Sequence, residues 1–349
     1  MAPRMAFEDL LRPTPQGLYC PPGDFHIDPV RPVARAVVTH GHADHARAGH
    51  ETVMATPETL AIMAARYGEN FATDRRPAAY GERITLNGVT VSFAPAGHVL
   101  GSAQAVVEKD GVRIVASGDY KRRADPTCAP FEVVPCDVFI TEATFALPVF
   151  VHPDTNDEIA RLLASVAQFP ERTHIVGAYA LGKAQRIIRL LRDAGYDEPV
   201  FIHGAMQKLC DLYREHGVDL GPLEPATISE KKNARGSGAG ARRDFAGKIV
   251  IAPPSAIQDK WARRFADPLP VFASGWMQIR QRVRQRGVEL PLQISDHADW
   301  NELTDTIREV GAQEVWITHG RDDALMRWAA LNGIKARPLR LVGYDDEGE

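Results

Sequence analysis

Short apolar runs that end on polar residues recur along the first half of the chain. Ala36–Val38 leads into Thr39, and Val138–Ile140 leads into Thr141 and Glu142. Runs of this length, rich in β-branched residues, predict buried strands. Because a strand presents the residues that follow it at one edge of its sheet, this repeated arrangement predicts a site along a sheet edge.

Alternating and helical patterns fill the intervals between these runs. Residues 83–86 and 90–94 alternate in polarity, and the Asn87-Gly88 pair between them is typical of a tight hairpin turn. The other elements expected before residue 147 are a strand at 25–28, a helix at 57–67, and a hairpin formed by 104–108 and 113–116.

Strands and helices alternate after about residue 147. We expect strands at 174–177, 200–202, 248–252 and 270–273. The helices are expected at 156–169, with Thr155 as N-cap, and at 184–194, 206–216 and 257–265. This alternation predicts a parallel, doubly wound sheet. A last helix is expected at 301–310, and a last strand at 315–320.

Two basic stretches interrupt this second half. Residues 231–243 combine lysines and arginines with glycines, which predicts a basic loop. Arg280, Arg282, Arg284 and Arg286 occupy every second position. On a strand they would line one face and form a track for phosphates, whereas on a helix they would spread around the cylinder. The pattern alone leaves both arrangements open.

Bulk properties narrow the class of protein. The chain of 349 residues is long enough for two domains, and its net charge of −4 means that any nucleic-acid contact must come from a local patch. The four cysteines form no CxxC pair, which argues against a disulfide framework or zinc finger and favours a reducing compartment. Because no apolar run reaches membrane-spanning length and no signal peptide is evident, we expect a cytoplasmic protein without membrane contact.

The densest chemistry lies directly after the run Ala36–Val38. His40, His42, Asp44 and His45 place three imidazoles and one carboxylate within six positions. In a rigid turn the first two can point one way and the last two another, which suggests two neighbouring metals. Imidazole and carboxylate ligands suit Zn(II), Mn(II) or Fe(II).

Other candidate ligands follow later strands. His98 is preceded by a glycine in a loop, Asp119 follows Gly118 at a strand end, and His319 ends the last apolar run. Beside the first cluster, we interpret Asp119 as a carboxylate that bridges two metals rather than an ordinary turn residue. Asp28 either orients the cluster from behind or forms a surface turn before Pro29.

The set of motifs resembles the β-CASP branch of the metallo-β-lactamase superfamily, whose members are nucleases acting on DNA or RNA. The HxHxDH signature at 40–45 carries the resemblance, and Glu142, His297 and His319 match the three β-CASP motifs. The resemblance implies an α/β fold, a metallo-β-lactamase αββα sandwich formed by 1–147 and 301–349. A doubly wound α/β β-CASP domain would be inserted at 148–300.

The resemblance also implies the ligand sets and the substrate. One metal would be held by His40, His42 and His98, the other by Asp44, His45 and His319, and Asp119 would bridge two Zn(II) or Mn(II) ions. The start at 17–28 and the stretch 295–300 are similar to bacterial ligase-associated DNA exonucleases, relatives of the Artemis and crosslink-repair nucleases. DNA is therefore the preferred substrate, with a functional link to a DNA ligase and helicase. His319 at the third motif is commoner in RNA-processing members, so RNA stays open.

The expected mechanism is hydrolysis of a phosphodiester by water. Asp44 or Asp119 would accept the proton of the attacking water, and His297, oriented by Glu142, would protonate the leaving oxygen. The alternative role for His297 is capping of the helix beside Asp299. Lys183 and Ser274, at glycine turns, are candidate phosphate contacts. A small-molecule hydrolase with the same metal core and an inactive scaffold are the rival classes.

Overall fold

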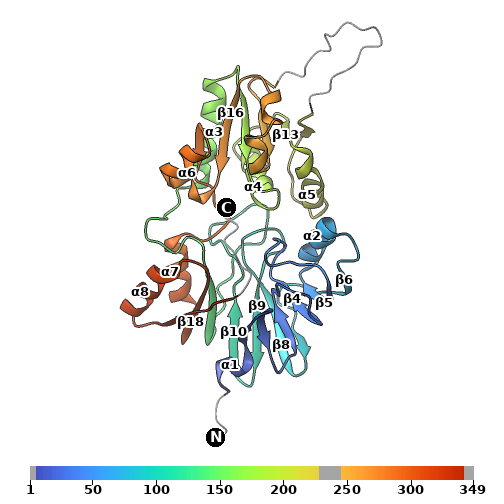
Figure 1. Cartoon of the computed structure of the whole chain (residues 1–349), viewed down its shortest axis with the longest axis vertical. Helices are drawn as coiled ribbons and strands as arrows, with labels where there is room; N and C mark the ends of the chain where they lie inside the picture. The colour runs from blue at the N-terminus through green and yellow to red at the C-terminus, as the bar shows by residue number, and fades with distance from the viewer. Residues whose placement is uncertain (1–4, 228–244, 342–349) are drawn as a thin grey trace. The chain divides into compact units, whose positions relative to one another are not determined.

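The chain folds into two compact units. The computed structural model describes residues 5–227 and 245–341 (Figure 1). One unit runs through the chain to Val151 and resumes at Asp296, and the other is His152–Ser295. The expected basic loop at 231–243 lies outside the described residues. Within the described ranges no helix is long and apolar enough to cross a membrane.

The first unit contains two sheets. The first sheet has the order β1 (Arg12–Thr14), β2 (Gly17–Cys20), β3 (Phe25–Ile27), β4 (Arg35–Val37), β5 (His50–Ala55) and β6 (Ala72–Pro77). The second has the order β19 (Lys335–Pro338), β18 (Glu314–Gly320), β11 (Val138–Ala143), β10 (Val112–Ala116), β9 (Ala103–Lys109), β8 (Val89–Pro95) and β7 (Ile84–Leu86).

Apolar side chains of both sheets form one buried cluster. Phe25 and Val37 of the first sheet belong to it together with Val91, Val107 and Ile114 of the second. Strand β8 alternates buried and half-buried positions, so one side of it is available for this core. The sheets therefore pack face to face.

Helices cover the outer faces. Leu60 and Met63 of α2 (Pro57–Tyr67) cluster with Val53 of the first sheet. Leu303 and Ile307 of α7 (Trp300–Glu309) cluster with the second sheet, beside which α8 (Asp323–Leu331) also lies (Figure 1). The remaining helix is the single turn α1 (Phe7–Leu10). This arrangement confirms the predicted αββα sandwich.

The Asn87-Gly88 turn confirms the hairpin prediction. Asn87 has φ 47° and Gly88 has φ 78°, the pair of positive values that a two-residue primed turn requires. Strands β7 and β8 pair antiparallel on either side of it. The helix predicted at 57–67 begins and ends at those residues, capped by the Thr56 hydroxyl, which accepts from the Thr59 N–H.

The second unit is built on one parallel sheet. Its order is β14 (Leu223–Pro225), β13 (Val200–Ile202), β15 (Ile249–Ala252), β12 (Thr173–Gly177), β16 (Pro268–Ala273) and β17 (Leu290–Leu292). The helical segments are α3 (Thr155–Gln168), α4 (Lys183–Asp193), α5 (Gly204–Glu215), the 3-10 turns η1 (Pro254–Ile257), η2 (Ala262–Arg264) and η3 (Gly275–Gln278), and α6 (Arg280–Gln285).

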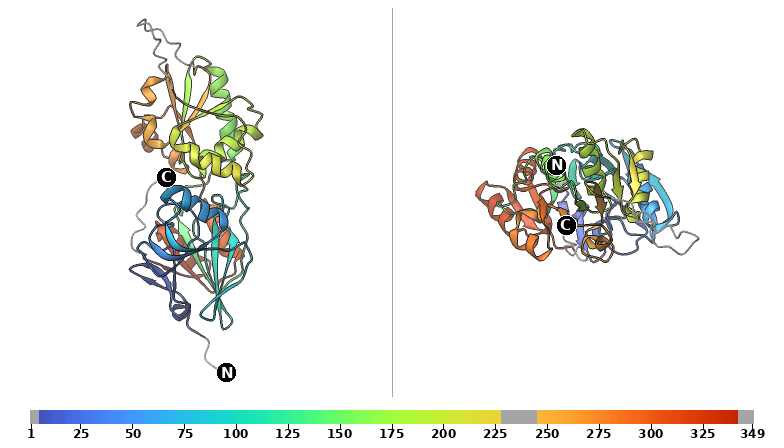
Figure 2. Two further views of the ribbon diagram at one scale, coloured as in Figure 1. Left: turned by 90° about the vertical axis from the view of Figure 1, so that its right-hand side faces the viewer. Right: turned by 90° about the horizontal axis from the view of Figure 1, so that it is seen from above.

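The order of these strands reverses direction in the middle of the sheet. The chain moves one way across the sheet through α4 and α5, and the other way through η1, η2 and α6. Right-handed crossovers then place the two sets on opposite faces of the sheet, as Figure 2 also shows. The predicted doubly wound architecture is confirmed.

Two local predictions for this unit are wrong, and one open alternative is decided. The helix expected at 257–265 is the pair of 3-10 turns η1 and η2, because the N–H groups of Asp259, Ala262 and Phe265 donate to carbonyls three residues earlier. The N-cap of α3 is Asp154, which accepts from Asn156, and not Thr155. The arginines from Arg280 onward lie on α6, which contradicts the strand alternative.

Candidate metal centre

The turn after β4 begins the site. Val38 still bonds to the neighbouring strand, and the backbone then folds back so that Ala46 N–H donates to the His42 carbonyl at 2.7 Å. A Cβ on Gly41 would lie 2.5 Å from the Ile62 side chain of α2, so the glycine allows this helix to pack against the turn. The close packing holds the donor residues of the turn in place.

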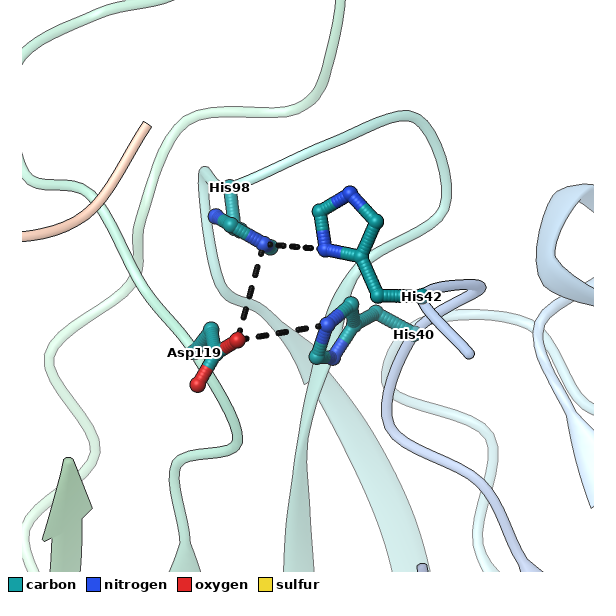
Figure 3. Close-up of side chains that lie close together, drawn as sticks. All are labelled: His40, His42, His98 and Asp119. Atoms are coloured by element: carbon teal, nitrogen blue, oxygen red, sulfur yellow. Dashed lines mark hydrogen bonds and ion pairs between the residues drawn. The ribbon is translucent and has the colours of Figure 1, made fainter. Parts of the chain in front are cut away.

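Four side chains converge on one side of this turn (Figure 3). Donor atoms of His40, His42, His98 and Asp119 lie within 4.8 Å of one another. Asp119 Oδ2 is 3.4 Å from His40 Nε2 and 3.7 Å from His98 Nε2. The His98 Nε2 is also 3.0 Å from His42 Nδ1. Three imidazoles and one carboxylate therefore face a common point.

A second group shares Asp119. Its donor atoms come from Asp44, His45 and Asp119, again within 4.8 Å. His45 Nε2 is 3.5 Å from Asp119 Oδ2 and 3.6 Å from Asp44 Oδ2. His319, at the end of β18, stacks its ring on that of His45 with centroids 5.0 Å apart. Because Asp119 Oδ2 is adjacent to both groups, the cluster is consistent with a binuclear metal site.

Hydrogen bonds behind the rings orient them. Asp28 accepts the Thr39 N–H at 2.8 Å and the Thr39 hydroxyl at 2.6 Å, and its Oδ2 is 2.8 Å from His45 Nδ1. Asp28 is buried, which favours the orienting role over a surface turn. His98 Nδ1 lies 2.9 Å from the Asp296 carbonyl. Engagement of Nδ1 leaves Nε2 of both rings directed at the centre.

Burial and neighbouring charges shift the pKa values of the residues in the cluster. Burial acts to lower the pKa of His45, but Asp119, Asp44 and Asp28 raise it to about 10. Burial acts to raise the pKa of Asp119, whereas His45 and His297 hold that pKa well below its usual range. Burial, aided by the neighbouring imidazoles, lowers the pKa of His98 and brings that of His319 to about 4. Metals bind neutral imidazoles and ionised carboxylates. His98, His319 and Asp119 therefore already have the forms that bind metals near neutral pH, whereas His45 would release its proton to a bound cation.

The donor set fits two divalent ions. Nε2 of His40 is buried and has no hydrogen-bond partner in the part of the chain that the structure describes. An imidazole nitrogen held in this way, close to other imidazoles and a carboxylate, is costly unless it meets a cation. The mixture of nitrogen and oxygen donors suits borderline metals such as Zn(II) or Mn(II).

Glu142 and His297 form a hydrogen-bonded pair next to these ligands. Glu142 Oε2 is 2.8 Å from His297 Nδ1, and its Oε1 accepts the Tyr120 N–H at 2.8 Å. Donor atoms of Asp119, Glu142 and His297 again lie within 4.8 Å. The alternative capping role of His297 is wrong, because Asp299 caps α7 by accepting the Glu302 N–H at 3.0 Å.

The sequence patterns did not identify Lys121 as a part of this site. Its buried ammonium donates to the His297 carbonyl and to Glu302 Oε2, both at 3.0 Å. Ala298 N–H also donates to the Tyr120 carbonyl at 2.7 Å. The loop after β10 is thus joined to the segment that carries His297. The sequence shows only that this lysine follows Asp119 and Tyr120, and that position does not indicate which residues the lysine contacts.

The two candidate phosphate contacts lie in the second unit. Lys183 begins α4 and is fully buried, with its ammonium 5.3 Å from the centre of the Tyr179 ring. The Ser274 hydroxyl is buried and accepts the Trp276 N–H at 3.2 Å, which starts η3. Their contact with substrate stays a prediction.

Comparison with known families identifies the class of protein. The profile of the β-lactamase superfamily domain matches residues 6–203, more than half of the chain. Together with the αββα sandwich and its His/Asp cluster, this match means that the chain belongs to the metallo-β-lactamase superfamily. The inserted α/β unit is the architecture expected of the β-CASP branch.

Individual relatives make the comparison more specific. The chain is 27% identical over 341 residues to a probable DNA ligase of Opitutus terrae, which covers 95% of this chain and 31% of that protein. It is 25% identical to cleavage and polyadenylation specificity factor subunit 3 of Dictyostelium discoideum, over 71% of this chain and 37% of that protein. It is 23% identical to an RNase J-like protein of Methanocaldococcus jannaschii, over 69% of this chain and 66% of that protein.

These alignments leave much of each relative unmatched. The chain spans between 31% and 66% of the length of these three proteins. Among solved structures, a protein of unknown function from Enterococcus faecalis is similar with a TM-score of 0.52 and 14% identity, over 88% of this chain and 79% of that one. That similarity supports the fold.

Proposed function

We propose that the protein is a two-metal nuclease that hydrolyses phosphodiester bonds of DNA, acting as an exonuclease in DNA repair. The observation that carries the proposal is the position of the Glu142–His297 pair, 2.8 Å apart, beside donor groups that share Asp119. A paired carboxylate and imidazole at a metal cluster provide an acid–base function in addition to metal binding. The inserted α/β unit and the nuclease names of several relatives favour a polymeric substrate over a small molecule.

Each side chain has a distinct task in this reaction. When bound, two divalent ions supply Lewis-acid charge neutralisation and make water more acidic. His40, His42, His98, Asp44, His45, His319 and Asp119 would hold them. Asp44 or Asp119 accepts the proton of the attacking water. Glu142 accepts the proton on Nδ1 of His297. When the ring is protonated, Nε2 also carries a proton, and it can pass this proton to the leaving oxygen.

The choice of DNA rests on a relative that aligns with nearly the whole chain. A protein named a probable DNA ligase aligns with 95% of this chain. This supports a nuclease that prepares ends in the same pathway as a ligase and a helicase. RNA is the second candidate substrate, because an RNase J-like protein and endoribonucleases of the YSH1 type are also similar to the chain.

A cleavage assay with four substrates tests the proposal. End-labelled single- and double-stranded DNA and RNA are incubated with the full chain and Mn(II) or Zn(II), and products are resolved on denaturing gels. We expect nucleotides to be released from DNA faster than from RNA. Asp119→Asn should remove the activity, whereas Asp110→Asn, at an exposed hairpin turn, is the matched control and should keep it.

Each outcome bears on one part of the proposal. Faster release from RNA would replace DNA by RNA as the substrate. Internal fragments in place of single nucleotides would contradict the exonuclease mode. Absence of cleavage of all four polymers would overturn the nuclease proposal as a whole.

A further inference from the structure

Helix α6 of the second unit carries an unusual concentration of positive charge. Arg280, Arg282, Arg284 and Arg286, which we call the α6 arginine cluster, lie on α6 and its C-cap. Residues 268–288 contain no acidic side chain, although the chain as a whole has a net charge of −4. Subtracting these four charges leaves −8 for the rest of the chain. The cluster is therefore a local reversal of the protein's charge.

No residue of α6 is buried. A helix of six residues without a buried face gains little from packing, and its three arginines and the one at its C-cap repel one another. An anionic partner would relieve this repulsion.

Three of the four arginines are not neutralised by ion pairs among the described residues. Among the residues that the structure describes, Arg280, Arg284 and Arg286 take part in no ion pair. The acidic residues that flank the segment in sequence are used elsewhere, since Asp267 and Glu289 pair with Arg172 at 3.3 and 2.7 Å. These three guanidinium groups are thus available to an external anion.

Aromatic rings hold two of the arginines. The Arg282 guanidinium lies 4.0 Å from the centre of the Trp276 ring, and that of Arg286 lies 4.5 Å from the Phe272 ring. Stacking uses the face of a guanidinium and leaves its in-plane N–H groups for hydrogen bonds. Arg280 and Arg284 are one helical turn apart and exposed. The two exposed arginines therefore share one side of the helix, and the two stacked arginines lie on another.

We propose that the α6 arginine cluster binds the phosphate backbone of a single DNA strand. Guanidinium groups match phosphate geometry by bidentate hydrogen bonds, and sites for single strands include a positively charged surface that follows the backbone. The choice of DNA rests on the proposed function. The binding surface itself rests on charge complementarity between α6 and a polyanion.

Binding in the absence of cleavage tests this proposal. The full chain in EDTA is titrated into a fluorescein-labelled single-stranded DNA oligonucleotide, and the dissociation constant is measured by anisotropy at several salt concentrations. We expect the double substitution Arg280→Gln/Arg284→Gln to weaken binding at least several-fold. The slope of log affinity against log salt should become shallower by about 0.7 for each lost phosphate contact.

A charge-matched variant serves as the control. Arg189→Gln/Arg214→Gln removes the same two charges from the same unit, at arginines that pair with Asp193 and Asp211. This control should change affinity and salt slope less than the α6 variant does. Because Arg280 and Arg284 are exposed, thermal unfolding of the α6 variant should match that of the unsubstituted protein.

The outcomes separate this inference from the proposed function. Equal affinities and slopes for the α6 variant and the unsubstituted protein would overturn the inference, even if the protein cleaves DNA. Loss of binding in the α6 variant would support it, even if no cleavage is found. Binding to anionic vesicles or RNA that is tighter than binding to DNA, and equally sensitive to the α6 substitutions, would overturn DNA as the partner.

Discussion

At the scale of single residues, the site contains carboxylates that contact a histidine with one bond and are held by a second hydrogen bond elsewhere in the protein. Asp28 bonds to Thr39 and His45, and Glu142 bonds to Tyr120 and His297. Such contacts fix ring orientation before any metal or substrate is bound. The ligand types could be predicted from sequence because they cluster in one short motif. Lys121 could not, because its two partners lie more than 170 positions away.

His297 can be separated from the metal ligands by substitution. His297→Ala should retain both metals but slow cleavage by roughly 10²–10⁴-fold, the usual contribution of an acid–base group. Metal content by elemental analysis and single-turnover rates measure the two quantities. Asp110→Asn is the control for both. A variant that loses metal would instead make His297 a ligand.

Lys121 and Glu302 should contribute to stability as a pair. Lys121→Met leaves the buried carboxylate of Glu302 without one of its cations, and breaking a buried pair in this way costs about 3–5 kcal/mol. In the double variant Lys121→Met/Glu302→Gln neither side chain leaves the other as an unpaired buried charge. The free energy of unfolding, measured with urea, should therefore fall by less than the sum of the two single losses. Additive effects would mean that the two side chains do not interact.

At the scale of elements, hydrophobic pattern predicted strands and helices wherever apolar spacing and turn chemistry agreed. The helix at 57–67 and the Asn87-Gly88 hairpin are examples. The helix prediction failed at 257–265, where backbone N–H groups donate to carbonyls three residues earlier, because apolar spacing does not separate short 3-10 turns from an α-helix. The arginines at 280–286 did not distinguish a strand from a helix, because no residue of α6 is buried and burial therefore imposes no period on the sequence.

Strand β5 begins with a histidine that should make the fold sensitive to acid. His50 is buried, its Nδ1 accepts the Val33 N–H at 3.2 Å, and burial lowers its pKa to about 4. In the unfolded chain the pKa of a histidine is about 6.5. The unfolded state therefore binds the proton first, and stability present above pH 6.5 is lost as the pH falls toward 4.

The substitution His50→Asn tests this origin of acid sensitivity. Asparagine can present an oxygen to the Val33 N–H but does not titrate. The free energy of unfolding is measured with urea at pH 7 and pH 4. Its fall between these pH values should be smaller in the variant than in the unsubstituted protein by roughly 3 kcal/mol, the part contributed by His50. Identical pH slopes for the two proteins would assign the acid sensitivity to other groups.

At the scale of the whole molecule, the fold brings together groups from distant parts of the sequence. Asp119 follows β10, His319 ends β18, and both adjoin the turn after β4. Sequence patterns could indicate that each donor stands at a strand end, but they do not state which strands neighbour one another in the sheet. The family resemblance supplied that information.

Metal binding should stabilise the first unit as a whole. A ligand that binds only the folded state raises stability by about 2.7 kcal/mol when its free concentration is a hundred times the dissociation constant. Adding Mn(II) or Zn(II) after EDTA treatment should therefore raise the midpoint of thermal unfolding. Asp119→Asn should abolish the increase and Asp110→Asn should retain it. An unchanged midpoint in the unsubstituted protein would contradict metal binding by the cluster.

The bond between Lys121 and the His297 carbonyl joins positions 176 residues apart in the chain. A ribosome that adds about 5–20 residues per second needs roughly ten seconds or more to synthesise that interval. During this time the turn at 40–45 and Asp119 already exist, but His297 and His319 do not. The donors of residues 40–119 are therefore synthesised well before His297 and His319. The full set of side chains around Asp119 can assemble only after both histidines have been made.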